Sequence, residues 1–82
     1  MLLTPRKIKP FTERLRQHRE DAGLTQVEVS ARLGMTDSAY QAYEAGRCSP
    51  PATKLVALSK IFNVTIELLV RGYDDYAGRK KC

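Results

Sequence analysis

Apolar side chains recur near the start of the chain with the period of an amphipathic helix. Four residues at i, i+4, i+7 and i+11 share one face of such a helix, and the charged residues between them lie elsewhere. They are Phe11, Leu15, His18 and Ala22. The pattern predicts a helix over residues 11–22 that ends before Gly23, with His18 as a half-buried packing residue rather than a ligand.

The next helix is predicted from its capping residues. Thr25 precedes Glu28 by three positions, the spacing of a capping box: the threonine hydroxyl accepts from the Glu28 amide, and the Glu28 carboxylate accepts from the Thr25 amide. Gly34 can adopt the left-handed conformation in which many helices end. The helix is therefore predicted over residues 26–33, with Val29 and Leu33 facing inward.

A third helix follows after a short connection. Thr36 can cap its start and Gly46 can end it, which gives residues 37–45. Tyr40 and Tyr43 are predicted to be core residues, and each hydroxyl then needs a partner or a path to water. The opposite face has short side chains and no Lys or Arg: Asp37, Ser38, Gln41, Ala42 and Ala45. Two short helices joined by a glycine-containing turn form a helix-turn-helix, whose second helix suits the DNA major groove.

Two further helices are predicted over residues 52–62 and 66–71. The inward positions of the first are Leu55, Leu58, Ile61 and Phe62. Pro50 and Pro51 fit its beginning, and Ser49 or the loop is expected to cap it. Thr65 caps the second, which ends at Gly72. The whole pattern predicts five helices and no strand, an all-α domain.

The 82 residues are expected to form one small domain between two polar ends. The prediction assigns residues 1–10 to a basic N-terminal arm, residues 11–72 to a helix-turn-helix domain and residues 73–82 to a polar, basic tail. A net charge of +5 favours a polyanionic partner without proving one.

Several classes of function are disfavoured by the composition. No apolar run approaches the roughly 18 residues that span a bilayer, and the N-terminus makes a poor signal peptide, so we expect a cytoplasmic protein without membrane partners. One histidine and two cysteines, Cys48 and Cys82, make neither a metal cluster nor a disulfide framework. Without a set of catalytic residues, we expect no enzyme and no cofactor. Cys48 can be read as a redox-sensitive thiol or, more commonly, as an inert residue.

One ordered set of residues carries more information than any of its parts. It comprises Gly23-Leu24-Thr25-Gln26, Glu28, Leu33-Gly34, Thr36, Glu44, Gly46, Pro50, Leu55, Leu58, Val64-Thr65 and Leu68-Leu69. In this set the chain resembles the phage repressor and Cro type of helix-turn-helix protein, the lambda repressor-like XRE family. The resemblance implies a five-helix lambda repressor-like bundle that binds double-stranded operator DNA, usually as a homodimer, with the helix over residues 37–45 in the major groove.

The resemblance also implies which residues read bases. They map to Asp37 and Ser38 at the start of that helix, and to Ala42 one turn later with Gln41 beside it. Asp37 has two open roles, because its carboxylate can accept from a cytosine amino group or simply favour the helix N-terminus. Ala42 can offer only a methyl group, to a thymine methyl or to nothing.

Other roles implied by the resemblance are a phosphate contact for Gln26 and a structural ion pair between Arg19 and Glu44. Because the reading helix has no Lys or Arg, affinity must come from basic residues outside it. The candidates for phosphate contacts, beside Gln26, are Arg32, Arg47, Lys54, Arg6, Lys7 and Lys9. Each of these basic residues can equally be a solubilising surface charge.

Two functions are weighed. The first is a sequence-specific transcriptional regulator, expected to be a repressor, which acts as a dimer: a phage repressor, a restriction-modification controller or an antitoxin that represses its own operon. Its dimer surface is expected at Ile66, Leu69, Val70, Tyr73 and Tyr76, unless Leu68 and Leu69 are core and the tyrosines belong to a tail. The second is a protein-interaction module that uses the same bundle on a partner protein.

Overall fold

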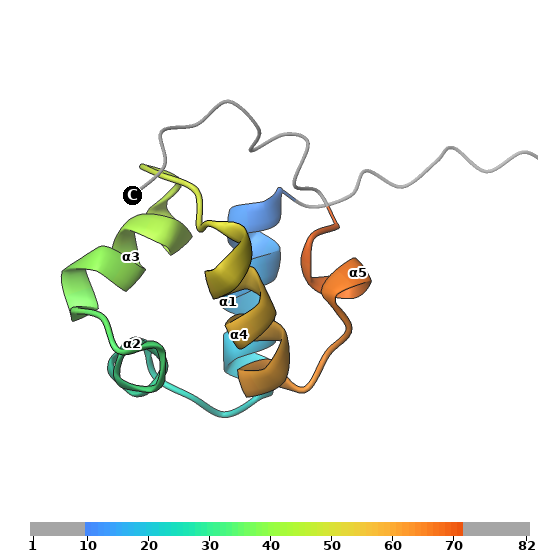
Figure 1. The fold of residues 1–82 in the computed structure, drawn as a ribbon, viewed down its shortest axis with the longest axis horizontal. Coiled ribbons are helices and arrows are strands. Elements are labelled where there is room, and N and C mark those ends of the chain that lie inside the picture. Colours follow the sequence, from blue (N-terminus) through green and yellow to red (C-terminus); the bar gives the residue numbers. More distant parts are fainter. Residues whose placement is uncertain (1–9, 72–82) are drawn as a thin grey trace, which may run out of the picture.

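The computed structural model describes residues 10–71, and in this range the chain forms five helices and no strand (Figure 1). The helices are α1 (Phe11–Asp21), α2 (Gln26–Leu33), α3 (Asp37–Ala45), α4 (Ala52–Phe62) and α5 (Ile66–Leu69). The predicted all-α fold is thus confirmed. The arm residues Arg6, Lys7 and Lys9 and the tail residues Tyr73, Tyr76 and Cys82 lie outside the described residues.

Three helices have the predicted bounds, and two end earlier than predicted. α1 ends at Asp21, and Ala22 is its capping residue. The prediction for α5 is wrong by two residues: it ends at Leu69 instead of residue 71. Val70 has ψ of 4°, so the backbone there has left the α-helical region.

The helices surround a single apolar core. Figure 1 shows α1 and α4 in the middle, with α2 and α3 on one side and α5 on the other. Every helix contributes to the core, whose buried members are Phe11, Leu15, Val29, Leu33, Tyr40, Tyr43, Cys48, Leu55, Leu58, Phe62 and Leu69. Because α2 and α3 are tied into the same core as α1 and α4, the outer face of α3 is presented from a rigid base.

The ends of the helices follow local chemistry. Both bonds of the capping box are present, with Glu28 N 3.1 Å from Thr25 Oγ1 and Thr25 N 2.8 Å from Glu28 Oε1. Gly34 has φ of 70°, a left-handed conformation that lets α2 turn sharply into α3. The expectation of a side-chain cap for α4 from Ser49 or the loop is wrong, since Pro51 occupies the N-cap and no side chain bonds there.

Candidate nucleic-acid interface

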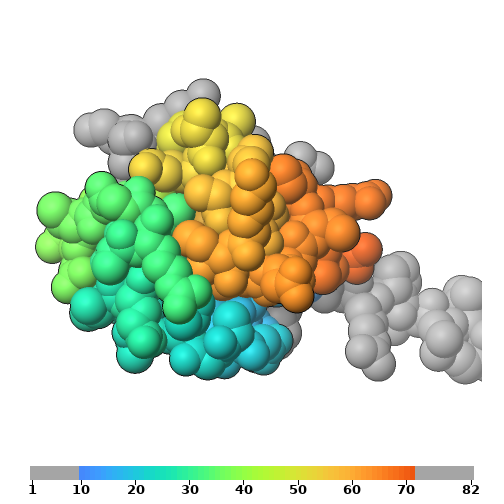
Figure 2. Space-filling model, turned by 60° about the horizontal axis from the view of Figure 1, so that its bottom comes forward, coloured from blue at the N-terminus to red at the C-terminus, as the bar shows by residue number. Residues whose placement is uncertain are grey.

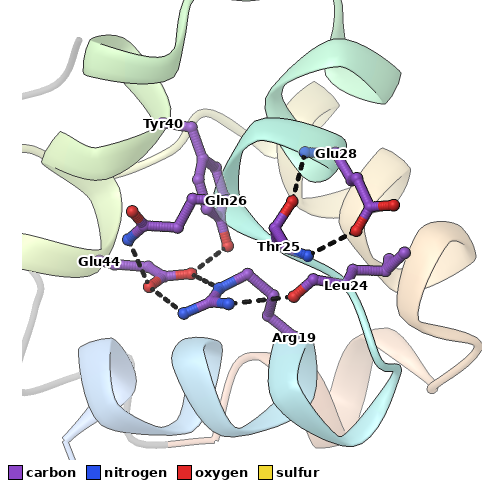
Figure 3. A network of polar contacts seen from close by, with 7 residues as sticks. All are labelled: Arg19, Leu24, Thr25, Gln26, Glu28, Tyr40 and Glu44. Atoms are coloured by element: carbon purple, nitrogen blue, oxygen red, sulfur yellow. Dashed lines mark hydrogen bonds and ion pairs between the residues drawn. The ribbon is translucent and has the colours of Figure 1, made fainter.

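A polar network centred on Glu44 joins three helices (Figure 3). Arg19 of α1 donates to Glu44 of α3 through Nε at 2.7 Å and Nη2 at 3.2 Å. Gln26 of α2 donates to Glu44 Oε1 at 3.0 Å, and the Tyr40 hydroxyl donates to Oε2 at 2.6 Å. Arg19 also donates to the carbonyl of Leu24 at 3.0 Å. The ion pair implied by the resemblance is therefore present, and two further donors that were not foreseen complete it.

The network keeps Glu44 ionised. Burial alone would raise its pKa, but hydrogen bonds from Arg19, Tyr40 and Gln26 outweigh burial and lower the pKa below the ordinary value of 4.5. The hydrogen bond to Glu44 likewise raises the pKa of Arg19, although burial opposes it. Burial and the bond to Glu44 raise the pKa of Tyr40, so its hydroxyl stays a donor. The charged pair of Arg19 and Glu44 and the neutral donors Gln26 and Tyr40 thus form a mutually satisfied cluster that fixes α3 against α1 and α2.

The outer face of α3 differs in part from the predicted reading face. Asp37, Ser38 and Gln41 are exposed. Ala42, by contrast, is half-buried and packs against the core cluster. Its place among the readout residues is therefore weakened, because a methyl group turned toward the core offers little to a base. Tyr40 and Tyr43 are buried, at 0% and 2% exposure, as predicted.

Asp37 is exposed, but its carboxylate is hydrogen-bonded to another helix. Its Oδ1 accepts a 2.6 Å hydrogen bond from the hydroxyl of Ser30, which lies in the middle of α2. Neither of the two roles left open for Asp37 included this bond. The carboxylate therefore links the two helices of the helix-turn-helix.

A pocket of about 260 Å³ lies where α1, α2 and the second half of α3 meet. Its lining residues are Arg16, Gln26, Gln41, Glu44, Ala45 and Arg47. Arg16 and Arg47 are both exposed, so two guanidinium groups are available beside the first turn of α2, where backbone amides also favour an anion. Arg16 is absent from the sequence-predicted site: the charge pattern of α1 placed it on a solvated face, and only the packing of α1 against α3 brings it here.

The other predicted phosphate contacts are scattered. Arg32 is exposed near the end of α2. Lys54 donates from Nζ to the carbonyl of Leu33 at 3.1 Å, so it satisfies one of the free carbonyls at the C-terminus of α2. Gln26 donates one hydrogen of its side-chain amide to Glu44, and the amide has a second hydrogen that can be donated to a phosphate.

The residues predicted for a dimer surface do not all reach the surface. Leu69 is fully buried, at 0% exposure, and cannot contact a second copy in this conformation. Ile66 and Leu68 are exposed at 41% and 37%, and Val70 is half-buried. Leu68, assigned to the core in one interpretation, thus takes the surface position that Leu69 was expected to have.

Figure 2 shows that α2 and α3 form one end of the molecule and α5 the other. The pocket with its two arginines belongs to the α2–α3 end, whereas the exposed apolar residues Ile66 and Leu68 belong to the opposite end. Apolar exposure is not confined to the α5 end, because Val27 of α2 is 57% exposed.

Two remaining single residues have packing roles. His18 is half-buried and stacks on Phe62, with ring centroids 6.5 Å apart; burial and the nearby Arg14 lower its pKa. Cys48 is buried and disulfide-bonded, so it is not the free thiol that the redox-sensing interpretation requires. Within residues 10–71, no group of His, Cys, Asp and Glu is suited to hold a metal ion, and none of the described helices is long and apolar enough to cross a bilayer.

Known proteins resemble this chain over most of its length. A family model described as a helix-turn-helix domain matches residues 10–71. The uncharacterized HTH-type transcriptional regulator YobD of Bacillus subtilis is 34% identical over 65 residues, which cover 79% of this chain and 58% of that protein. The similarly named YqaE of the same organism is 37% identical over 62 residues, covering 76% and 53%.

A further relative is the HTH-type transcriptional activator BcrR of Enterococcus faecalis, 36% identical over 62 residues that cover 76% of this chain and 30% of BcrR. The chain thus spans little more than half of the first two relatives and less of the third. No solved structure matches the chain.

Proposed function

Because the chain belongs to the XRE type of helix-turn-helix DNA-binding domain, we propose that it is a transcriptional regulator that binds double-stranded operator DNA and reads base edges in the major groove with α3. The observation that carries this proposal is the combination of an exposed face of short side chains without Lys or Arg on α3 with a rigid attachment of that helix to the bundle. Ser38 and Gln41 present short polar groups on that face, and the Glu44 network holds the helix in place.

The dimensions of α3 support this role. Its nine residues make a rod about 13 Å long, and the major groove, about 12 Å wide, admits a single helix end. The side chains along the exposed face are short, so the helix can approach the bases closely. Ser38 and Gln41 then carry the choice of base, with Asp37 at the first turn.

Affinity comes from the flanks of the helix. The pocket between Arg16, Gln26 and Arg47 offers two positive charges, an amide donor and the N-terminus of α2 to a backbone phosphate. Glu44 lies in the same pocket, but its charge is already neutralised by Arg19 at 2.7 Å. Further phosphate contacts come from Arg32 and from the arm residues Arg6, Lys7 and Lys9. Lys54 contributes mainly by stabilising the C-terminus of α2.

We place the dimer surface on α5, with Ile66 and Leu68 in contact across the symmetry axis and Val70 at its margin. One domain with a few short reading side chains binds weakly, and two copies on half-sites about 34 Å apart bind far more tightly. Repression is the proposed mode, because occupying a promoter site requires nothing beyond DNA binding. Sedimentation of Ile66→Asp tests the dimer: the variant should be monomeric at concentrations where the parent is dimeric.

A protein-interaction module is the second candidate, and one observation favours it. Ile66 and Leu68 on α5 and Val56 on α4 are each at least 37% exposed, and exposed apolar residues often mark contacts with another protein. α5 lies at the end away from α3, so a partner protein bound at Ile66 and Leu68 is compatible with DNA binding by the same molecule.

Selection of bound sequences from random DNA, followed by band shifts in rising salt, tests the proposal. We expect one selected sequence to bind at least about a thousandfold more tightly than bulk DNA, with an affinity that falls steeply with salt because counterions are released from the phosphates. Substituting Ser38 or Gln41 should change the preferred base. Absence of salt-sensitive binding at low salt would contradict DNA binding and leave the interaction module as the function.

A further inference from the structure

A buried serine of α2 is bonded to the residue that opens α3. Ser30 is only 1% exposed, and its hydroxyl lies 2.6 Å from Asp37 Oδ1 and 2.8 Å from the carbonyl oxygen of Val27. A hydroxyl has one proton to donate. The shorter distance and the negative charge favour donation to the carboxylate, since charge-assisted O–H···O⁻ bonds are typically about 2.5–2.7 Å long.

This bond distinguishes the two oxygens of the Asp37 carboxylate. Oδ1 is engaged by Ser30, and within residues 10–71 Oδ2 accepts no hydrogen bond, while the Asp37 side chain is exposed. Ser30 is buried on α2 next to the core residue Val29, so its hydroxyl has a fixed position. It therefore holds the Asp37 carboxylate in one orientation instead of a set of rotamers. A base-reading group discriminates best when its orientation is set before DNA arrives.

We propose that Ser30 is a positioning residue for base recognition: by holding Oδ1 of Asp37 it leaves Oδ2 as a single oriented acceptor on α3, which selects a base with an exocyclic amino group. Such groups in the major groove are N4 of cytosine and N6 of adenine, and a carboxylate suits the cytosine amino group in particular. The proposal rests on the DNA-reading function proposed above. Ser30 never touches the DNA and acts only through Asp37.

The chain offers a matched control for the substitution of Ser30. Ser59 of α4 is also buried, at 7% exposure, and its hydroxyl donates to the carbonyl of Val56 three residues earlier, at 2.7 Å. That is the same local bond that Ser30 can make to Val27. Ser59→Ala therefore removes a comparable hydroxyl from a comparable helix without touching Asp37.

The experiment compares base preference, position by position, for the selected DNA sequence bound by the parent chain, Ser30→Ala, Ser59→Ala and Asp37→Asn. At the base pair read by Asp37, Ser30→Ala should lower the discrimination about tenfold, and Ser59→Ala should leave it unchanged. In Asp37→Asn the amide oxygen still accepts from Ser30, so the amide NH₂ faces outward. The preferred base should then change to one that presents an acceptor and no amino group in the major groove, which is guanine or thymine.

Other results would overturn the proposal. If Ser30→Ala weakens binding to every sequence equally, or acts no differently from Ser59→Ala, the serine is a structural link only. If Ser30→Ala does not fold, Asp37→Asn decides: a change to adenine, read through both amide groups, means that the side chain is not oriented by Ser30. A parent chain that selects no sequence refutes the DNA-reading function and this proposal together, whereas a selective parent with an unaffected Ser30→Ala refutes this proposal alone.

Discussion

Replacing Glu44 with glutamine is the sharpest perturbation of the fold, because the substitution keeps the side chain's size and removes its charge. Four hydrogen bonds from Arg19, Tyr40 and Gln26 converge on this carboxylate. A neutral amide can accept at only one of its two ends, so its NH₂ group would face another donor. Arg19 would keep its bond to the Leu24 carbonyl and lose its counter-charge.

The size of the effect follows from burial. The side chains of Arg19 and Glu44 are 12% and 5% exposed, and breaking a buried ion pair by removing one partner costs about 3–5 kcal/mol. Since Arg19 retains some exposure and one carbonyl, we expect about 3 kcal/mol for Glu44→Gln. For a domain of this size each kcal/mol lowers Tm by roughly 4–8 °C, which gives a decrease of about 12–24 °C.

Thermal and urea unfolding followed by circular dichroism measure this loss. Glu13→Gln is the matched control, because Glu13 is an exposed carboxylate in the first turn of α1 and its loss should cost less than about 0.5 kcal/mol. In the double variant with Arg19→Met, the total cost should be smaller than the sum of the single costs, since neither charge is then left alone. A loss for Glu44→Gln as small as that for Glu13→Gln would refute the reasoning.

Three other predictions follow from the same contacts. Because the pKa of Glu44 is lowered, its contribution to the free energy of unfolding is complete above about pH 4.5 and is lost as pH falls through the lowered pKa. Urea unfolding between about pH 6 and pH 3 should therefore show a free energy of unfolding that decreases toward low pH for the parent and decreases less for Glu44→Gln. Lys54→Met leaves the Leu33 carbonyl without its charged donor and should lower the free energy of unfolding in urea by about 1 kcal/mol. An unchanged urea midpoint would contradict a stabilising role for this hydrogen bond. Gln26→Ala should weaken binding to all DNA sequences alike in a band shift; an effect on one operator position only would contradict a phosphate contact.

The fold could be predicted closely because its signals are local. Thr25, Thr36 and Thr65 each cap a helix through their hydroxyls, and Gly34 and Gly46 end helices in the left-handed conformation. Such signals act within a few residues of the chain, where a sequence can be read directly. The end of α5 lies where no such signal operates in the described range, and there the prediction ran two residues too long.

The site could be predicted less well because it depends on packing between helices. The charge pattern along α1 assigns Arg16 to solvent, and only the packing of α1 against α3 brings it to the pocket. The bond from Ser30 to Asp37 likewise depends on how α2 meets α3. Leu68 and Leu69 are adjacent apolar residues, and their sequence alone does not decide which faces inward.

The central claim is that the exposed face of α3 enters the DNA major groove while residues at the start of α2 contact the DNA backbone. Amide chemical-shift changes in an NMR titration with the selected duplex test it most directly. We expect the largest changes at Ser38, Gln41 and Gln26, with small changes at Ile66 and Leu68. Changes concentrated on α5, with α3 unaffected, would contradict the account.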